Sequence, residues 1–324
     1  MLENRILFFY QANFFADPRW SPLPARCRWP VTADKRDLPR VKCVIFHLPA
    51  LTPADWPELW NLYKMKPPDQ VWVAFTMESV VRYPPFADPA FLAMFDYEMS
   101  YRQAADFWLP YVAPDMPAAF ASTKIAAKKR LCCAFLSSAM DLSGRQRLMT
   151  ELMDYLPVDS FGRFKRNRRL FRDKGVATKL RVMSRYRFTF AFENAIDPDY
   201  VTEKLFQPLA VGSIPVYLGA PNVDEFSPGD DAYINAADFG GARELADYLL
   251  TADDARHHAW RQRPLRQAFL DKAARSRAQP RAALRRALRP PGGGPLAGRR
   301  VRTARVDGRL RVEVEDLFEQ PGGG

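Results

Sequence analysis

Short, continuously apolar runs recur along this chain, and each is followed by a loop or by a segment with the apolar spacing of a helix. An apolar run without polar alternation indicates a strand that is buried on both faces, which is the pattern of a parallel sheet. The helical segments between the runs suit the crossovers that parallel strands require. The sequence therefore predicts an α/β protein, with strands at residues 6–10, 41–48, 70–77, 131–136, 186–192 and 213–219.

The predicted strands and helices form two series, separated near residues 114–123. The second series includes a helix predicted over residues 145–156, which Pro157 ends. We therefore predict two Rossmann-like domains that face each other, at residues 1–118 and 119–272. No sequence period of roughly 20–50 residues recurs, so a repeat architecture is excluded.

Positive charge is concentrated near the end of the sequence. The whole chain carries a net charge of +11, and residues 273–324 hold twelve arginines against five acidic residues, a net of +7. The first 272 residues therefore carry only +4, which is 11 minus 7. The last segment is rich in Ala, Arg, Pro and Gly, so we predict a disordered basic tail from residue 273. With 48% hydrophobic residues, the chain as a whole can bury sizeable cores.

The sequence shows no signal for membrane insertion or secretion. No run of about 18 apolar residues occurs, and the first ten residues lack the basic region and cleavage site of a signal peptide. The four cysteines are Cys27, Cys43, Cys132 and Cys133. The last two are expected to be buried thiols, and a disulfide between the first two is left open because spacing alone does not decide it.

The densest group of chemically active side chains follows the fifth predicted strand. That strand ends in Glu193-Asn194, and after a turn Asp199 is expected as the N-cap of the next helix. Glu203 and Lys204 then fall in the first turn, where free N–H groups and the helix dipole favour an anion such as a phosphate. A crevice at the carboxyl ends of parallel strands is where nucleotides bind in open α/β folds.

These residues resemble the signature of the α-1,3-fucosyltransferases, glycosyltransferase family 10. Three motif clusters stand in the family's order within 36 residues, which makes the match specific. They are Phe-Ala-Phe-Glu-Asn at 190–194, Asp-Tyr-Val-Thr-Glu-Lys at 199–204 and Gly-Ser-Ile-Pro-Val at 212–216. Further segments resemble family blocks in the same order, at residues 77–79, 95–111 and 129–167, and the resemblance covers about residues 6–270.

The resemblance implies a GT-B architecture and an inverting transfer of L-fucose from GDP-β-L-fucose to a glycan, expected at the 3-OH of GlcNAc. Inversion needs one carboxylate to take the proton of the acceptor hydroxyl as that oxygen attacks the anomeric carbon. Glu78 aligns with the family's candidate base. Val80 stands where the family has a proline.

The resemblance also implies which cations contact the donor. Arg145 and Lys204 match family residues at the diphosphate, whose charge grows as GDP leaves, and Ser138 stands where the family usually has Asn. These two cations are expected to suffice, so no cofactor is assigned, and stimulation by a divalent cation is left open. Asp197-Pro-Asp199 has the form of a metal motif, but its place in a turn before a helix favours N-capping, so no metal ligands are assigned.

Four more residues complete the predicted donor site. On the family match, Tyr200 is assigned to the edge of the phosphate and Glu203 to the ribose. Glu193 and Asn194 are expected to line the same crevice.

Two alternatives remain open from the sequence. The chain is an inactive or truncated family member, or it is a basic protein that binds a polyanion or nucleic acid through residues 163–172 and the tail. The tail has one aromatic residue, Phe318, and so lacks a stacking platform for bases. This lack argues against nucleic acid as a partner. The expected partners are GDP-fucose and a GlcNAc-containing glycan or glycoprotein. The resemblance implies the lumenal side of the Golgi membrane, with an anchor that is not visible in this sequence.

Overall fold

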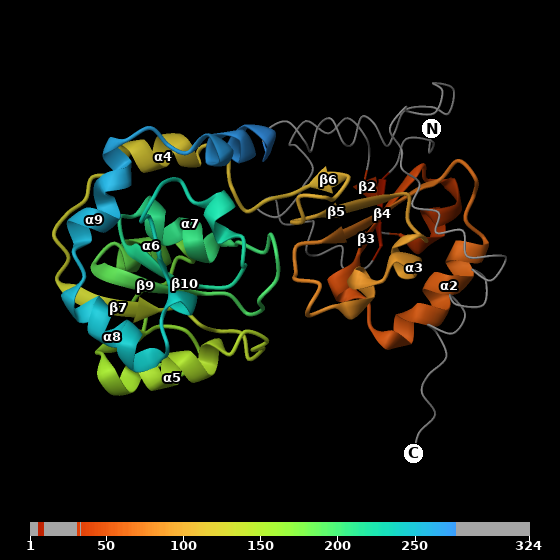
Figure 1. Cartoon of the computed structure of the whole chain (residues 1–324). Coiled ribbons are helices and arrows are strands. Elements are labelled where there is room, and N and C mark those ends of the chain that lie inside the picture. The colour runs from red at the N-terminus through yellow and green to blue at the C-terminus, as the bar shows by residue number, and fades with distance from the viewer. Residues whose placement is uncertain (1–5, 10–30, 33, 277–324) are drawn as a thin grey trace, which may run out of the picture. The chain divides into compact units, whose positions relative to one another are not determined.

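The computed structural model of the chain describes residues 6–9, 31–32 and 34–276. These residues fall into two compact units (Figure 1). Unit 1 comprises the described residues up to Ser100 together with Ala104–Leu109, and unit 2 comprises Tyr101–Gln103 together with the described residues from Pro110 onward. The chain thus leaves unit 1 after Ser100, returns for one short segment and then leaves again. The predicted boundary between residues 118 and 119 falls within helix α4 (Met116–Ser122) of unit 2.

Unit 1 is built on a sheet of parallel strands. Its described strands and α-helices are β1 (Ile6–Phe9), β2 (Val31–Thr32), β3 (Cys43–His47), α2 (Trp56–Lys64), β4 (Val71–Thr76), α3 (Pro89–Leu92), β5 (Tyr97–Ser100) and β6 (Phe107–Trp108). The strand order is β2-β1-β3-β4-β5-β6, and each pair is parallel. The strands predicted at 6–10, 41–48 and 70–77 are confirmed.

Helices α2 and α3 pack on one face of this sheet. Leu59 of α2 and Phe91 of α3 share a buried cluster with Phe46 of β3 and Trp72 of β4. The Trp72 indole donates a hydrogen bond to Gln70 Oε1 at 2.8 Å, and the Gln70 amide donates to two backbone carbonyls. The buried polar groups of Gln70 and Trp72 are therefore paired, which fixes the start of β4 in place.

Unit 2 is built on a second parallel sheet. Its described strands are β7 (Arg130–Ala134), β8 (Val158–Ser160), β9 (Tyr186–Phe192), β10 (Ile214–Leu218) and β11 (Ile234–Asn235). They lie in the order β11-β10-β9-β7-β8, and each pair is parallel. The chain runs from β7 to β8 and then crosses back to form β9 on the other side of β7. The strand order therefore reverses between β7 and β9, and the carboxyl ends of these two strands form the switch point at which open α/β sheets bind ligands.

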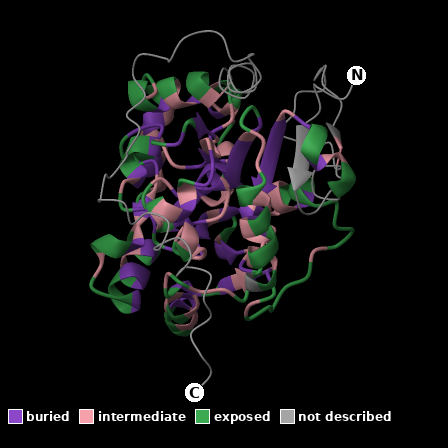
Figure 2. Ribbon diagram, turned by 90° about the vertical axis from the view of Figure 1, so that its right-hand side faces the viewer, coloured by how far each residue is buried: buried purple, intermediate pink, exposed green. Residues whose placement is uncertain are grey.

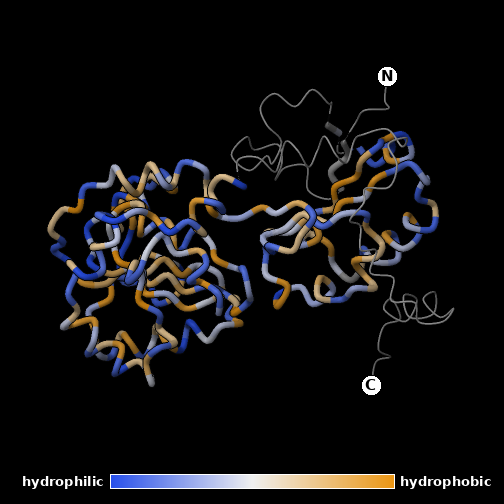
Figure 3. The backbone as a smooth tube through the Cα atoms, turned by 45° about the horizontal axis from the view of Figure 1, so that its top comes forward, coloured by the Kyte–Doolittle hydropathy of each residue, from blue (hydrophilic) through white to orange (hydrophobic). Residues whose placement is uncertain are grey.

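Helices cover both faces of the unit 2 sheet, as strands buried on both sides require. On one face α5 (Arg145–Tyr155) packs against α8 (Ala242–Thr251), and on the other α6 (Val176–Met183) packs against α7 (Glu203–Ala210) (Figure 1). The short helix α9 (Asp254–His258) follows α8. Figure 2 colours the central strands of unit 1 as buried, and the strands of unit 2 are likewise buried between helical layers whose outer faces are exposed. The same strands are hydrophobic in Figure 3, so the core lies between the sheet and its two helical layers.

The helix after β9 begins later than the sequence predicts, and Asp199 is not its N-cap. Thr202 caps α7, since its Oγ1 accepts a hydrogen bond from the Lys204 N–H at 3.3 Å. Asp199 has a φ of 67° and accepts hydrogen bonds from the backbone and side chain of Gln103 and from the Asn222 amide. These partners are far away in sequence, so local spacing could not reveal them.

The predicted disordered tail begins too early. Residues 267–276 are helical, and both Phe269 and Ala273 are buried. Alanine and arginine favour helices, and apolar neighbours in unit 2 supply the packing. The remainder of the predicted tail lies outside the described residues.

The cysteines that the structure describes are buried thiols. Cys132 and Cys133 lie in β7, as expected, and Cys43 lies in β3, where burial raises the pKa of its thiol to about 12. Cys27 lies outside the described residues. The Cys27–Cys43 disulfide that the sequence left open is therefore not tested. No helix in the described ranges is both long and apolar enough to span a bilayer.

Candidate active site

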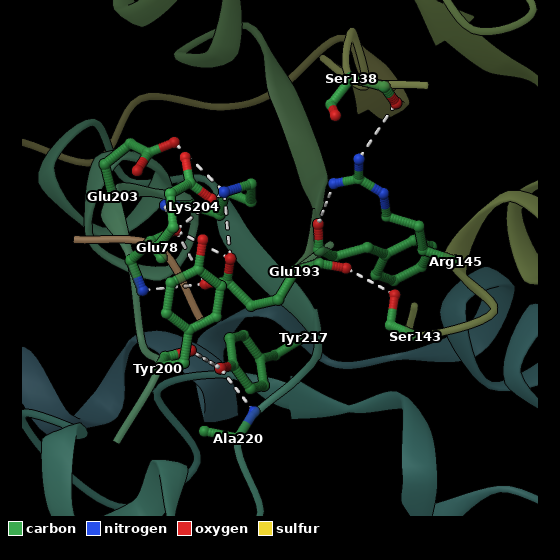
Figure 4. Close-up of polar contacts among 12 residues, drawn as sticks. Glu78, Ser138, Ser143, Arg145, Glu193, Tyr200, Glu203, Lys204, Tyr217 and Ala220 are labelled. Atoms are coloured by element: carbon green, nitrogen blue, oxygen red, sulfur yellow. Dashed lines mark hydrogen bonds and ion pairs between the residues drawn. The ribbon is translucent and has the colours of Figure 1, made fainter. Parts of the chain in front are cut away.

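The carboxyl end of β9 carries a buried carboxylate. Glu193 follows β9 directly, and its side chain is 0% exposed. Its Oε1 accepts hydrogen bonds from the N–H and from the hydroxyl of Thr202, each at 2.8 Å, and its Oε2 lies 3.0 Å from Lys204 Nζ (Figure 4). A carboxylate is tolerated inside a protein when its charge is paired and its oxygens accept hydrogen bonds. These contacts therefore hold Glu193 in one position at the switch point.

The first turn of α7 supplies the more open part of the same cluster. Lys204 Nζ lies 3.0 Å from Thr202 Oγ1 and 3.4 Å from Glu203 Oε1. The Lys204 side chain is 25% exposed and that of Glu203 is 39% exposed. The N–H of Lys204 is bonded to Thr202 Oγ1. An anion at this helix end would therefore meet chiefly the Lys204 ammonium group.

Four charged groups around this cluster shift one another's pKa values. Burial raises the pKa of Glu193, and Lys204 opposes that change. Burial acts to lower the pKa of Lys204, but the carboxylates of Glu193 and Glu203 outweigh it and raise that pKa. Burial acts to raise the pKa of Glu203, but Lys204 and Lys179 outweigh it and lower that pKa. Lys204 and Glu203 therefore keep opposite charges at neutral pH. Sequence reasoning missed Lys179, because it comes from α6 and belongs to no motif.

Arg145 lies under the loop that follows β7 rather than on the surface. Its guanidinium donates hydrogen bonds to the backbone carbonyls of Ser138 (3.2 Å), Met140 (2.9 Å) and Phe192 (3.3 Å). The residue is only 2% exposed, and burial lowers its pKa. Its Nε is buried and has no hydrogen-bond partner among the described residues. The arginine thus ties the loop to the end of β9.

A capping residue of α5 was also missed from the sequence. Asp141 accepts hydrogen bonds from the N–H groups of Arg145 and Gln146, each at 3.0 Å. It stands four positions before the helix, and Gly144 between them has a φ of 74°, in the left-handed region. The sequence Asp-Leu-Ser-Gly just before a helical pattern is the local signal that identifies this cap. The carboxylate occupies the N-terminus of α5, where an external anion would otherwise bind.

Tyr200 and Asn194 are buried in the same region. The Tyr200 ring lies edge-on to Tyr101 at 5.1 Å between ring centroids and to Tyr111 at 6.4 Å. The Tyr217 hydroxyl donates to the Tyr200 carbonyl at 3.4 Å (Figure 4). Asn194 is 8% exposed, and its side-chain Oδ1 has no hydrogen-bond partner among the described residues. All six donor residues predicted in unit 2 thus gather around the carboxyl ends of β7 and β9.

Asp197 and Asp199 are each engaged in hydrogen bonds within unit 2. Asp197 accepts a hydrogen bond from the Tyr101 hydroxyl at 2.6 Å, and Asp199 is held by Gln103 and Asn222. The described residues contain no group of three or more His, Cys, Asp or Glu side chains placed to hold a metal ion.

The candidate base, Glu78, belongs to unit 1 and follows β4. Its N–H donates to Thr76 Oγ1 at 2.9 Å, and its Oε2 lies 3.1 Å from an Arg82 nitrogen. The Glu78 side chain is 35% exposed. Val80, which replaces the family's proline, packs against the unit 1 core beside Tyr83. The structure therefore anchors the loop of Glu78 through apolar contacts and leaves the carboxylate accessible.

The chain matches two family models that together span most of its length. The model described as the C-terminal part of glycosyltransferase family 10 (fucosyltransferase) matches residues 125–282, and the fucosyltransferase N-terminal model matches residues 4–112.

Among curated relatives, alpha-(1,3)-fucosyltransferase 7 of Mus musculus is 32% identical over 251 residues, covering 74% of this chain and 59% of the relative. GDP-fucose protein O-fucosyltransferase 3 of Bos taurus is 38% identical over 126 residues, covering 36% of this chain and 26% of the relative. The chain spans less than two thirds of the length of these relatives.

Among solved structures, a crystal structure of an alpha1,3-fucosyltransferase superimposes with a TM-score of 0.59 at 16% identity. The superposition covers 86% of this chain and 90% of that one. At this identity the likeness shows the fold, an α/β architecture with parallel sheets of the GT-B kind.

Proposed function

Because the chain belongs to glycosyltransferase family 10, the fucosyltransferase family, we propose that it transfers L-fucose from GDP-β-L-fucose to a glycan hydroxyl, with inversion at the anomeric carbon. The observation that carries the proposal is the cluster of Glu193, Glu203 and Lys204 at the switch point of the unit 2 sheet. This is the position where open α/β sheets bind nucleotides. The similarity to a GDP-fucose protein O-fucosyltransferase supports a GDP-linked donor.

Lys204 is the group best suited to the leaving diphosphate. Its ammonium is partly exposed and is fixed by Glu193, so it needs little rearrangement when negative charge develops on the β-phosphate. Arg145 Nε and Asn194 Oδ1 are a buried donor and a buried acceptor that lack partners within the described residues. A nucleotide in the crevice would supply them, since buried polar atoms are rarely left unpaired. Glu203 is the proposed acceptor of hydrogen bonds from the ribose hydroxyls.

Glu78 is proposed as the general base. In one displacement, its carboxylate takes the proton of the acceptor hydroxyl while that oxygen bonds to the anomeric carbon of fucose. The bond between this carbon and the β-phosphate oxygen breaks, and its electron pair leaves with GDP. Arg82, 3.1 Å from Glu78, orients the carboxylate.

The 3-OH of GlcNAc is the proposed acceptor position, in line with the alpha-(1,3) relatives. The match to a protein O-fucosyltransferase makes a protein hydroxyl the second acceptor to test. By the same family membership we expect action on the lumenal side of the Golgi. We also expect turnover without an added metal ion, which activity in the presence of a chelator will test.

The decisive experiment separates donor binding from transfer. Calorimetry measures GDP binding, and transfer from GDP-fucose is followed on GlcNAc-containing glycans and, separately, on folded protein domains. The proposal predicts that wild type does both and that Glu78→Gln binds GDP without transferring fucose. Binding without turnover on either acceptor class would identify an inactive family member. A folded wild-type protein that does not bind GDP would refute the donor site itself.

A further inference from the structure

A pocket in unit 2 is lined by arginines that the proposed reaction does not use. It has a volume of about 410 Å³ and lies between α6, the loop after β8, and the first residues of β7 and β9. Its arginines are Arg130, Arg168, Arg169, Arg181 and Arg185, and the lining residues include no acid. A neighbouring hollow shares Phe171, Thr178 and Arg181 with this pocket and adds Arg172 and Lys174.

The pocket is separate from the proposed donor site. Tyr186, which lines it, is the first residue of β9, whereas Glu193 follows the last residue of that strand. A strand rises about 3.3 Å per residue, so Tyr186 lies roughly 20 Å from Glu193, at the opposite end of the same strand.

Within the described ranges, three of the five arginines have no partner for their positive charge. Asp159 pairs with Arg130 and Arg168, each at 2.7 Å. The side chains of Arg169, Arg181 and Arg185, by contrast, make no hydrogen bond or ion pair within the part of the chain that the structure describes. These three side chains are exposed at the rim of the hollow. Like charges that converge on one hollow repel one another, and an anion in that hollow would relieve the repulsion.

The polar groups of the pocket fit a ligand that only accepts hydrogen bonds. Guanidinium groups donate and cannot accept. The Tyr186 hydroxyl donates to Asp159 at 2.7 Å, and the Thr178 hydroxyl accepts from the Lys174 N–H at 2.9 Å, so both are engaged. Sulfate oxygens are acceptors only and match the two-pronged geometry of arginine. A nucleobase, in contrast, needs acceptors for its own N–H groups.

The apolar part of the lining narrows the choice of ligand further. Phe161, Leu170 and Val182 line the same hollow, and Phe171 at its edge is 79% exposed. A pyranose ring presents C–H groups that pack on such surfaces, while its sulfate groups point outward to cations. We propose that this pocket binds a multiply sulfated saccharide, through Arg169, Arg181 and Arg185.

This site does not depend on fucosyl transfer, so it is tested by binding alone, with the full chain and no donor. The probe is a heparin-derived tetrasaccharide, compared with its desulfated, N-acetylated counterpart. The test variant is Arg181→Glu with Arg185→Glu. The control is Arg243→Glu with Arg263→Glu, which changes the net charge equally at two exposed arginines outside the pocket.

The proposal predicts that the test variant loses at least tenfold in affinity for the tetrasaccharide, that the control loses less than threefold, and that the desulfated probe binds poorly. Bound tetrasaccharide should also protect Arg169, Arg181 and Arg185 of wild type from an arginine-specific reagent, read by mass spectrometry, and leave Arg243 reactive. If the test variant fails to fold, protection of the wild-type protein still tests the proposal. It also distinguishes binding in the pocket from binding to the arginines beyond residue 276.

Several results would overturn the proposal. They are equal losses in the two variants, equal binding of the desulfated probe, no measurable binding, and no protection of the three arginines. Stronger competition by an RNA oligonucleotide or by phosphatidylserine vesicles would also overturn it, by assigning the pocket to a phosphate-bearing partner.

Discussion

The two units hold their candidate functional carboxylates in opposite ways. In unit 2, Glu193 is 0% exposed, and its oxygens are taken by Thr202 and Lys204. In unit 1, Glu78 is 35% exposed and lies on a loop fixed by apolar contacts of its neighbours. A buried charge is costly to disturb, whereas an exposed one contributes little to folding. Stability and chemistry should therefore be coupled in unit 2 and separable in unit 1.

Glu78→Gln is expected to show the largest effect of all. It should lower turnover and leave GDP affinity and stability nearly unchanged. Loss of a general base lowers the rate by about 10²- to 10⁴-fold, while the free energy of unfolding changes by no more than about 0.5 kcal/mol. The measurements are kcat with GDP-fucose, GDP affinity by calorimetry, and thermal melting. Glu58→Gln removes an exposed, ion-paired carboxylate from the same unit and should leave all three unchanged. A Glu78→Gln protein that melts much earlier would erase the contrast between the units.

Lys204→Met should reduce both stability and GDP affinity. It leaves the buried Glu193 carboxylate without its ammonium partner, which costs about 3–5 kcal/mol. Burial already raises the pKa of Glu193, and without Lys204 it rises further. The folded state then binds a proton that the unfolded state has released, so the variant loses stability as pH increases above about 4.3 and through the raised pKa.

A second substitution separates the two effects of Lys204. Glu193→Gln combined with Lys204→Met removes the unpaired charge and should recover most of the lost stability, as measured by urea unfolding, but none of the GDP affinity. Recovery of both would mean that Lys204 acts only through Glu193.

Thr202→Val should have an intermediate effect, confined to unit 2. It removes the cap of α7 and a hydroxyl bonded to Glu193, at a combined cost of about 1–2 kcal/mol. Thr202→Ser keeps the hydroxyl and serves as the matched control. Urea midpoints of the two variants provide the comparison, and equal midpoints would show that the cap contributes nothing.

The smallest expected effect is a loss of stability in mild acid, one contribution from each unit. Burial lowers the pKa of His47 in unit 1 and of His258 in unit 2 from 6.5 to about 4. The unfolded chain takes up protons first, so this stability is complete above pH 6.5 and is lost as pH falls toward 4. Both rings are partly exposed, which reduces the effect. We therefore expect each histidine to lower the free energy of unfolding by about 1 kcal/mol between pH 7 and pH 5. His47→Gln and His258→Gln should each flatten the pH dependence of melting, and an unchanged slope in either would exclude that histidine.

The sequence predicted the longer strands β1, β3, β4, β7, β9 and β10, because runs that are apolar throughout have few other uses in an α/β chain, but it did not predict the short strands β2, β5, β6 and β11. The sequence also assigned six residues to one donor site, and the structure has them at one edge of one sheet. They are Arg145, Glu193, Asn194, Tyr200, Glu203 and Lys204. The errors arose where distant residues decide. Asp199 is held by Gln103 and Asn222 instead of capping a helix. Lys179 joins the charge cluster from another helix.

The short excursion of the chain into unit 2 at residues 101–103 limits how this protein can be divided into separate fragments. Tyr101–Gln103 belong to unit 2, although residues on either side of them belong to unit 1. Asp197, only 6% exposed, is bonded to the Tyr101 hydroxyl. A fragment that starts at Pro110 loses that donor, at a cost of about 1–3 kcal/mol. The two units are therefore not interchangeable modules in the gene: a chimera that takes unit 2 from this chain must also carry these three residues, inserted within the coding region of the other unit.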